Sequence, residues 1–278
     1  MTTTLRPTGP IQQGTDGAKS RDYEVCDNGR AIGSVRVGTD AGFGAAAGVL
    51  SSLTIDEASR RRGRGTIAAL AAEEVLRGWG CGRVRMEAPE GNEGVRRLAA
   101  SLGYTERSRN MAKELGATAP ALPEGLVARP MTPAEFEAWR AVAVDAYAQS
   151  WIDRGVPADQ AMKKSLADHA RNLPDGLDTE GAHLHVLVDG STVVGHVWVT
   201  LLGNDDGGVD GFVYDVEVEE QHRGRGHGRA LMLQAERIAL AGGARGIALH
   251  VFAANTPALR LYESLGYRTT QYNLVKEL

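Results

Sequence analysis

One segment of the sequence, called here the closing segment, occurs twice in the chain, and this internal repeat restricts the possible folds more than any other feature. "SLGYTERSRNMAKEL" spans residues 101–115 and "SLGYRTTQYNLVKEL" spans 264–278, with eight of fifteen positions identical at an offset of 163. A repeat of this length in a chain of 278 residues predicts two copies of one domain rather than an array of short units. Three further pairs keep nearly the same spacing: "AIGSVRV" (31–37) with "VVGHVWV" (193–199), "RRRGRG" (60–65) with "QHRGRG" (221–226), and Asn92 with Asn255.

The boundary between the copies follows the first closing segment. "GATAPALPEG" (116–125) has the composition of a linker, so the predicted division is a shortened copy at 1–115, a linker at 116–123 and a complete copy at 124–278. Only about 20 loosely composed residues precede the first hairpin, which leaves the first copy no room for the helix pair expected in the second.

The second copy has a mixed α/β order. "GLVARP" indicates a strand, and Thr132 with Glu135 forms a capping box that begins a helix carrying Trp139, Tyr147 and Trp151. A second helix, about 157–172, precedes two strands that meet at an Asp-Gly turn. Then follow "FVYDVEV", a glycine-rich turn, a helix to about 241, "GIALHVF", a helix from about 256 and a final strand.

Composition narrows the class of protein. An apolar fraction of 42% with 24% charged residues is typical of a globular protein, and the N-terminus lacks the order of a signal peptide. We therefore expect a cytoplasmic protein with no membrane partner. Cys26 and Cys81 lie too far apart for a metal knuckle or redox pair and are interpreted as small buried residues, so no metal is expected. All seven histidines fall after residue 120.

The turn "QHRGRGHGRALM" indicates an anion site. Gly224, Gly226 and Gly228 allow backbone N–H groups to point outward together at a helix N-terminus, which attracts phosphates, and two arginines add positive charge. A dinucleotide fingerprint would need glycine where Arg229 stands, and the Gly-Lys-Ser/Thr ending of a nucleotide P-loop is absent. The tract also stops too soon for an RNA-binding repeat, so no nucleic-acid partner is expected.

These motifs resemble those of the GNAT superfamily of N-acetyltransferases. Gln221-x-x-Gly224-x-Gly226 and its first-copy counterpart beginning at Arg60 are similar to the family's acyl-CoA loop, and Asn255 followed by Tyr262 is similar to a second signature. The resemblance covers about 125–278 well and 22–115 partially. It implies two tandem GNAT-like domains, each a mostly antiparallel mixed sheet flanked by helices, with a splayed strand pair for acyl-CoA.

The resemblance also implies roles for individual residues, with acetyl-CoA as the acyl donor. The loop amides would bind its diphosphate, the preceding strand would pair with its pantetheine arm, and Tyr262 would be the general acid that protonates the leaving thiolate. The side chains of His222 and His227 are expected on the exterior of the turn. The implied cofactor-binding residues are Val216, Val218, Arg223, Gly224, Arg225, Gly226, His227, Gly228 and Asn255.

The general base stays open between His250, whose reference pKa suits neutral pH, and Glu217 on the strand before the loop. Asp215 shares the face of Glu217 by strand alternation and could orient the substrate or face water. The first copy has Ala99 at the position of Tyr262, so catalysis is expected only in the second copy.

The expected acceptor is a primary amine of a small molecule or peptide. The loop "GNDDGGVDG" with Asp205, Asp206 and Asp210 would attract a cationic amine if it forms a funnel, while a solvated acidic loop is the alternative. Two other functions remain: a non-catalytic CoA-binding sensor, and an enzyme like the mycothiol-forming acetyltransferases, which also have two copies. A monomer and a homodimer are both compatible with two fused copies.

Overall fold

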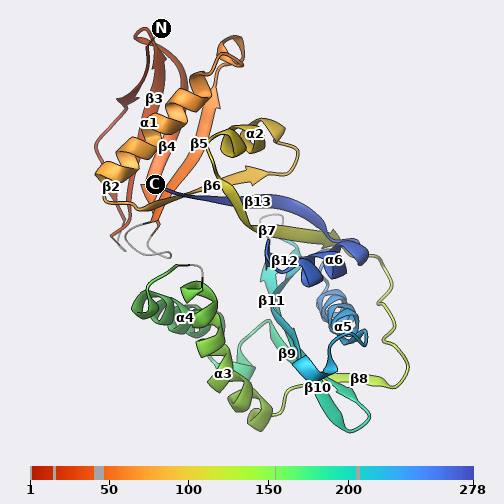
Figure 1. Cartoon of the computed structure of the whole chain (residues 1–278). Coiled ribbons are helices and arrows are strands. Elements are labelled where there is room, and N and C mark those ends of the chain that lie inside the picture. The colour runs from red at the N-terminus through yellow and green to blue at the C-terminus, as the bar shows by residue number, and fades with distance from the viewer. Residues whose placement is uncertain (1, 15–16, 41–46, 154, 205–206) are drawn as a thin grey trace. The chain divides into compact units, whose positions relative to one another are not determined.

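The structure is a computed structural model that describes residues 2–14, 17–40, 47–153, 155–204 and 207–278 (Figure 1). The chain divides into two compact units. Unit 1 contains residues 1–108 together with 271–278, and unit 2 contains residues 109–270. Each unit is a mixed α/β structure with a mostly antiparallel sheet, as the sequence predicted.

The sheet of unit 2 has the strand order β7-β12-β11-β10-β9-β8. Its neighbours are antiparallel from β8 to β11, while β11 and β12 run parallel. The predicted hairpin is confirmed, because β9 and β10 meet at Gly190 with φ 61°. The strands are β7 (Thr105–Glu114), β8 (Leu126–Pro130), β9 (Ala182–Asp189), β10 (Thr192–Gly203), β11 (Val209–Val218) and β12 (Gly246–Phe252).

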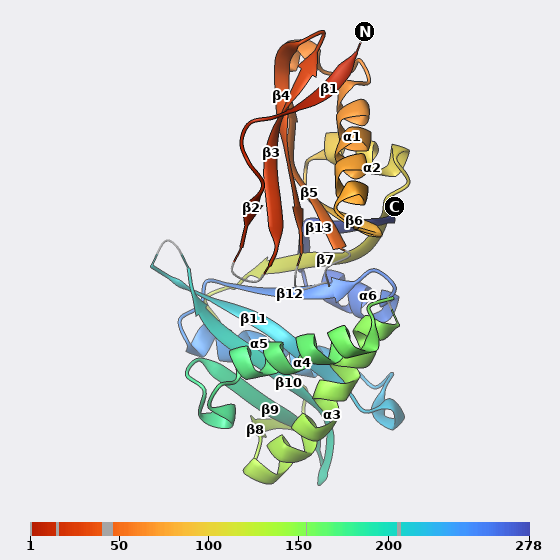
Figure 2. The ribbon, with the colours of Figure 1, turned by 90° about the vertical axis from the view of Figure 1, so that its left-hand side faces the viewer.

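Helices cover both faces of this sheet (Figure 2). The pair α3 (Pro133–Ile152) and α4 (Ala158–Asn172) lies on one face, and α5 (His227–Ala241) lies on the other with α6 (Thr256–Ser264) near it. The predicted capping box is confirmed: the Thr132 hydroxyl accepts from the Glu135 N–H at 3.3 Å, and a Glu135 carboxylate oxygen accepts from the Thr132 N–H at 2.8 Å.

Unit 1 repeats this plan without the helix pair. Its strand order is β1-β3-β4-β5-β6-β13, and β2 pairs with β3. Cys26 and Cys81 are free and buried, as predicted. The strands are β1 (Thr3–Pro7), β2 (Gln12–Gln13), β3 (Lys19–Asp27), β4 (Arg30–Thr39), β5 (Ala47–Ile55), β6 (Arg83–Pro89) and β13 (Arg268–Glu277); the helices are α1 (Arg64–Gly78) and α2 (Glu93–Ser101). Short 3-10 turns occupy Glu57–Ser59, Gly176–Asp178 and Glu220–His222.

Each unit is closed by the strand that the other copy of the sequence supplies. In unit 1, β13 pairs antiparallel with β6 from Gln271 opposite Pro89 to Glu277 opposite Arg83. In unit 2, β7 lies beside β12. The predicted boundary at residues 115 and 124 describes the duplicated sequence and stays a prediction, whereas the compact units exchange their closing strands.

The fold also corrects the alignment of the two glycine-rich turns. Matching the letters "RGRG" gave an offset of 161, but the N-cap residues of the two helices are Gly63 and Gly226, which are 163 residues apart and share left-handed φ values of 75° and 87°. Arg61, with φ 58°, therefore corresponds to Gly224, with φ 76°. The first copy carries a side chain where the backbone favours glycine, which adds local strain to its loop.

Among the helices of the described segments, none is both long enough and apolar enough to cross a membrane.

Candidate active site

A wedge opens between β11 and β12 in unit 2. The parallel pairing runs only from Gly211 opposite Ile247 to Val213 opposite Leu249, and Tyr214 is an extra residue in the register between β10 and β11. This bulge bends β11 away from its neighbour. A cavity of about 150 Å³ lies in the wedge, lined by residues 213–216, residues 249–252, Asn255 and Tyr262.

Glycine beside the bulge permits the strands to approach closely. A Cβ atom on Gly195 of β10 would lie 2.3 Å from the carbonyl oxygen of Glu217, and on Gly33 of unit 1 it would lie 2.1 Å from the carbonyl oxygen of Thr54. Both distances are far inside van der Waals contact. A glycine at this close approach is therefore common to the two copies, and a side chain at either position would push β11 or β5 outward.

The glycine-rich turn presents free backbone donors at the start of α5. Within the described segments, the N–H groups of residues 224–229 have no protein acceptor, because the first helix-type bond runs from Ala230 N–H to Gly226. Such a cluster of unpaired donors at a helix N-terminus suits a phosphate group. The turn therefore leaves these N–H groups available to an anion.

The arginines of this turn differ in their surroundings. The guanidinium of Arg223 folds back onto the end of β11, where Nε donates to the carbonyl of Val218 at 3.0 Å and a terminal nitrogen lies 3.6 Å from Glu217. Arg225 is exposed. The expectation for His227 was wrong: its side chain is only 3% exposed and lies beneath the turn rather than on its exterior.

Tyr262 projects from α6 into the cavity and is 6% exposed. Burial, together with the charge of Asp215, raises its pKa to about 12, so its phenol keeps its proton at neutral pH. Asn255 lines the same cavity and caps α6, where its side-chain oxygen accepts from Ala258 N–H at 3.3 Å. Asn92 makes the same cap in unit 1, so helix capping by itself accounts for this repeated asparagine.

The structure separates the two base candidates. His250 lines the cavity with Tyr262, and its ring packs edge-on against Phe252 at 5.1 Å between centroids. The Glu217 side chain is 57% exposed, lies 3.6 Å from Arg223 and is not among the residues that line the cavity. Of the cofactor candidates on β11, Val216 lines the cavity, and Val218 is half-buried at the end of the strand.

Asp215 lines the cavity and contacts two side chains, which makes it more important than the sequence indicated. One carboxylate oxygen accepts from Trp139 Nε1 at 3.2 Å and contacts His196 Nε2 at 2.8 Å. Burial alone would raise the pKa of Asp215, but the His196 contact and the indole lower it overall. Burial likewise opposes protonation of His196, yet Asp215, with Glu217 and Glu219, raises the His196 pKa.

His196 was missed, although the repeat gave a signal for it. In the strand "VVGHVWV" it lies two residues before Trp198, so alternation places both on one face of the sheet. An aromatic shell surrounds this face: Trp139 contacts Trp198 edge-on at 5.7 Å, and Trp198 stacks on Tyr214 at 4.7 Å. The predicted acceptor side, beneath α3, is therefore occupied by aromatic rings.

The expected acidic funnel lies only partly within the described residues. Asp205 and Asp206 lie outside the described residues, and Asp210 accepts from Asn204 Nδ2 at 3.0 Å at the start of β11. Seven residues of strand separate Asp210 from Glu217, a distance of about 23 Å. Among the described acidic residues of this set, Asp215 and Glu217 are the ones at the wedge end of β11.

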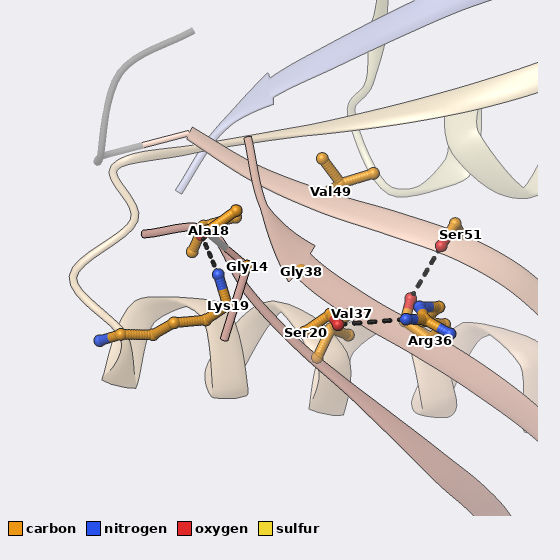
Figure 3. Close-up of a pocket in the computed structure, with 10 residues that line it drawn as sticks. Gly14, Ala18, Lys19, Ser20, Arg36, Val37, Gly38, Val49 and Ser51 are labelled. Atoms are coloured by element: carbon orange, nitrogen blue, oxygen red, sulfur yellow. Dashed lines mark hydrogen bonds between the residues drawn. The ribbon is translucent and has the colours of Figure 1, made fainter. Parts of the chain in front are cut away.

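The matching strands of unit 1 carry different side chains (Figure 3). A hollow of about 290 Å³ lies on β3, β4 and β5, where Arg36 occupies the position that Trp198 holds in the second copy. Arg36 donates to Ser20 Oγ at 3.1 Å, and Ser51 Oγ donates to the Arg36 carbonyl at 3.4 Å. Within its described residues, unit 1 thus lacks the helix pair, the aromatic shell and, with Ala99, the tyrosine.

The family model described as "Acetyltransferase (GNAT) family" matches residues 9–104 and 137–267. The chain belongs to this family, and the match in two regions confirms a tandem arrangement of two GNAT-like domains.

The curated relatives fall into two groups. A mycothiol acetyltransferase of Saccharomonospora viridis is 29% identical over 96% of this chain and 86% of its own length. Another, from Thermobispora bispora, is 36% identical over 74% of this chain and 68% of its own length. The uncharacterized N-acetyltransferase YycN of Bacillus subtilis is 30% identical over 54% of this chain and 96% of its own length.

Solved structures show the same fold. A GCN5-related N-acetyltransferase from Sphaerobacter thermophilus matches with a TM-score of 0.59 and 24% identity, covering 92% of this chain and 80% of that one. A tandem GNAT protein from the clavulanic acid biosynthesis pathway matches with a TM-score of 0.52 and 20% identity, covering 95% and 85%.

Proposed function

We propose that the second copy transfers the acetyl group of acetyl-CoA to a primary amine of a small molecule or peptide by direct attack of the amine. The observation that carries this proposal is the wedge cavity, which brings Tyr262, His250 and Asp215 together at the edge where β11 leaves β12. The amide loop follows directly from the end of β11, so a donor bound along the strand would reach both.

The residues present fit acetyl-CoA. The free N–H groups of residues 224–229 suit its diphosphate, and the side of β11 beyond Val213, no longer paired with β12, offers backbone groups to the amides of the pantetheine arm. A backbone N–H near Val218 would donate to the thioester carbonyl. A preorganised donor of this kind contributes roughly 3 kcal/mol in the transition state.

Proton transfer divides between the two sides of the cavity. Tyr262, with a pKa raised to about 12, holds the proton that the departing thiolate would accept. The amine must lose a proton, and His250 is the base candidate within the cavity, whereas Glu217 would act from its rim through water. Asp215, with a lowered pKa, stays charged and would bind the ammonium form of the acceptor.

The aromatic shell supports a cationic acceptor. Rings of Trp139, Trp198 and Tyr214 lie around the Asp215 carboxylate, and aromatic faces attract ammonium groups at close range. An acceptor of the mycothiol type is the second candidate, because a relative named mycothiol acetyltransferase aligns with 96% of this chain. The third candidate, a CoA-binding sensor, would bind the donor without consuming it.

The test is release of free thiol from acetyl-CoA in the presence of an acceptor panel of polyamines, aminoglycosides, amino-terminal peptides and a mycothiol-type amine. We expect turnover with cationic amines and calorimetric binding of acetyl-CoA. Binding without thiol release would establish the sensor, and a preference for neutral or anionic amines would refute the role given to Asp215.

A further inference from the structure

His227 makes two polar contacts beneath the amide loop that the proposed reaction does not use. Its ring is 3% exposed at the first position of α5. Nδ1 lies 3.0 Å from the carbonyl oxygen of His222, and Nε2 lies 3.2 Å from a carboxylate oxygen of Asp189, the last residue of β9. The ring therefore connects the loop to a hairpin nearly forty residues earlier in the chain.

The two contacts specify a charged ring. A backbone carbonyl and a carboxylate both only accept hydrogen bonds, and a neutral imidazole carries a proton on one nitrogen alone. Both contacts become hydrogen bonds when both nitrogens are protonated. The imidazolium also faces the negative charge of Asp189, while the His222 ring lies 6.3 Å away and Glu219 lies 3.8 Å from His222.

The first copy supplies an independent comparison. Arg64 stands at the corresponding position, 163 residues before His227, and its side chain is 10% exposed. One terminal nitrogen donates to the carbonyl of Ser59 at 3.3 Å, and the other donates to the carboxylate of Asp27, at the end of β3 in the matching hairpin. Arginine is always protonated in proteins, so one copy makes this pair of bonds with a permanent cation.

We propose that His227 in its imidazolium form is a positioning residue that ties the amide loop to the β9–β10 hairpin and so sets the affinity for the diphosphate of acetyl-CoA. This inference rests on the proposed function of the loop. The free N–H groups of residues 224–229 surround His227 in the chain, and their common direction depends on how the first turn of α5 is held. Loss of a proton from the ring removes one of its two bonds and releases that turn.

The experiment compares His227→Gln with His227→Arg, the residue of the first copy, by KM for acetyl-CoA and by kcat. Loss of a charge-assisted hydrogen bond predicts a KM increase of about tenfold or more for His227→Gln with kcat little changed. His227→Arg should restore most of the affinity. Arg64→Gln removes the matching bonds in unit 1 and is the control for general destabilisation, with KM expected to stay at the wild-type value.

Nitrogen NMR distinguishes positioning by a charged ring from simple packing. Measured on the full chain without acetyl-CoA, under the conditions of the kinetic assay, the His227 ring should show two protonated nitrogens. A neutral ring, or His227→Arg binding as weakly as His227→Gln, would overturn the inference.

The measurements distinguish a failure of the proposed function from a failure of the positioning role of His227. If wild-type protein neither binds nor consumes acetyl-CoA, the role of the loop is wrong, yet the NMR signature of a doubly bonded His227 would persist. If wild-type protein binds acetyl-CoA and both variants bind equally well, only the positioning role is wrong.

Discussion

Lys276 is expected to hold the exchanged strand of unit 1 through a buried ion pair. Its Nζ lies 2.7 Å from the carboxylate of Glu73, whose side chain is fully buried on α1, and 5.7 Å from the centre of the Tyr104 ring. Burial and the nearby Glu73 charge both raise the Tyr104 pKa, so the phenol stays neutral and Lys276 is the cation that compensates Glu73. The substitution Lys276→Met would leave the Glu73 carboxylate buried without its cationic partner.

The expected cost is large. Removing one partner of a buried pair destabilises by about 3–5 kcal/mol, whereas replacing both partners with apolar residues is close to neutral. We therefore expect Lys276→Met to cost about 3 kcal/mol or more and the double variant Glu73→Leu/Lys276→Met to recover most of that loss. Arg77→Met, which breaks an exposed pair with Glu74, is the control and should cost at most about 1 kcal/mol.

Hydrogen exchange measured by mass spectrometry is the suitable assay, because a chain of two units need not unfold in one step. Peptides covering residues 83–89, the partner strand of β13, should lose protection in Lys276→Met and regain it in the double variant. The matched substitution in unit 2 is Lys113→Met, opposite Glu236, and it should instead expose β12. Unchanged protection of residues 83–89 in Lys276→Met would refute the reasoning.

Three further substitutions test the site. Tyr262→Phe should lower kcat by about 10²- to 10⁴-fold with little change in the KM for acetyl-CoA, and full turnover would remove its role as general acid. Because the His196 pKa is raised above 6.5, the stability that protonated His196 contributes to the fold is present at low pH and is lost as pH rises through that pKa. Asp215→Asn should therefore reduce the fall of the denaturation midpoint with rising pH. An unchanged fall would contradict the pairing of His196 with Asp215. Gly195→Ala places a Cβ atom 2.3 Å from the Glu217 carbonyl, so we expect a loss of at least about 1 kcal/mol in unfolding free energy together with weaker acetyl-CoA binding, and wild-type values for both would show that β11 can move.

Local patterns predicted much of the fold because local contacts decide those features. The capping box at Thr132 and the Asp189-Gly190 turn were found at the predicted places, since each depends on hydrogen bonds and φ values within a few residues. The alignment of the two loops failed for the opposite reason. Identical letters matched Gly63 to Gly224, while the backbone matches Gly63 to Gly226 and leaves Arg61 in a left-handed conformation.

The candidate site was predicted in part. Asn255, His250 and Tyr262 were chosen from one motif and its neighbouring strand, and the structure brings all three to one cavity. His196 and the contact between Trp139 and Asp215 depend on where α3 crosses the sheet, and no spacing along the chain expresses that position. The contact between the buried His227 ring and Asp189 was not predicted, because Asp189 lies in a different supersecondary element.

The sequence by itself determined that this protein is a duplicated α/β domain, because offsets of 161 to 163 repeated over several motifs have no other simple source. It could not determine which sheet each closing strand completes. The two closing segments, which form β7 and β13, share eight of fifteen residues, so either strand presents nearly the same face to either sheet. Lys113 and Lys276 are equivalent in the repeat, as are Glu73 and Glu236, so the sequence offers the same ion pair to either arrangement. Only the tertiary structure shows that β13 completes unit 1, where Lys276 pairs with Glu73, and that β7 completes unit 2, where Lys113 pairs with Glu236.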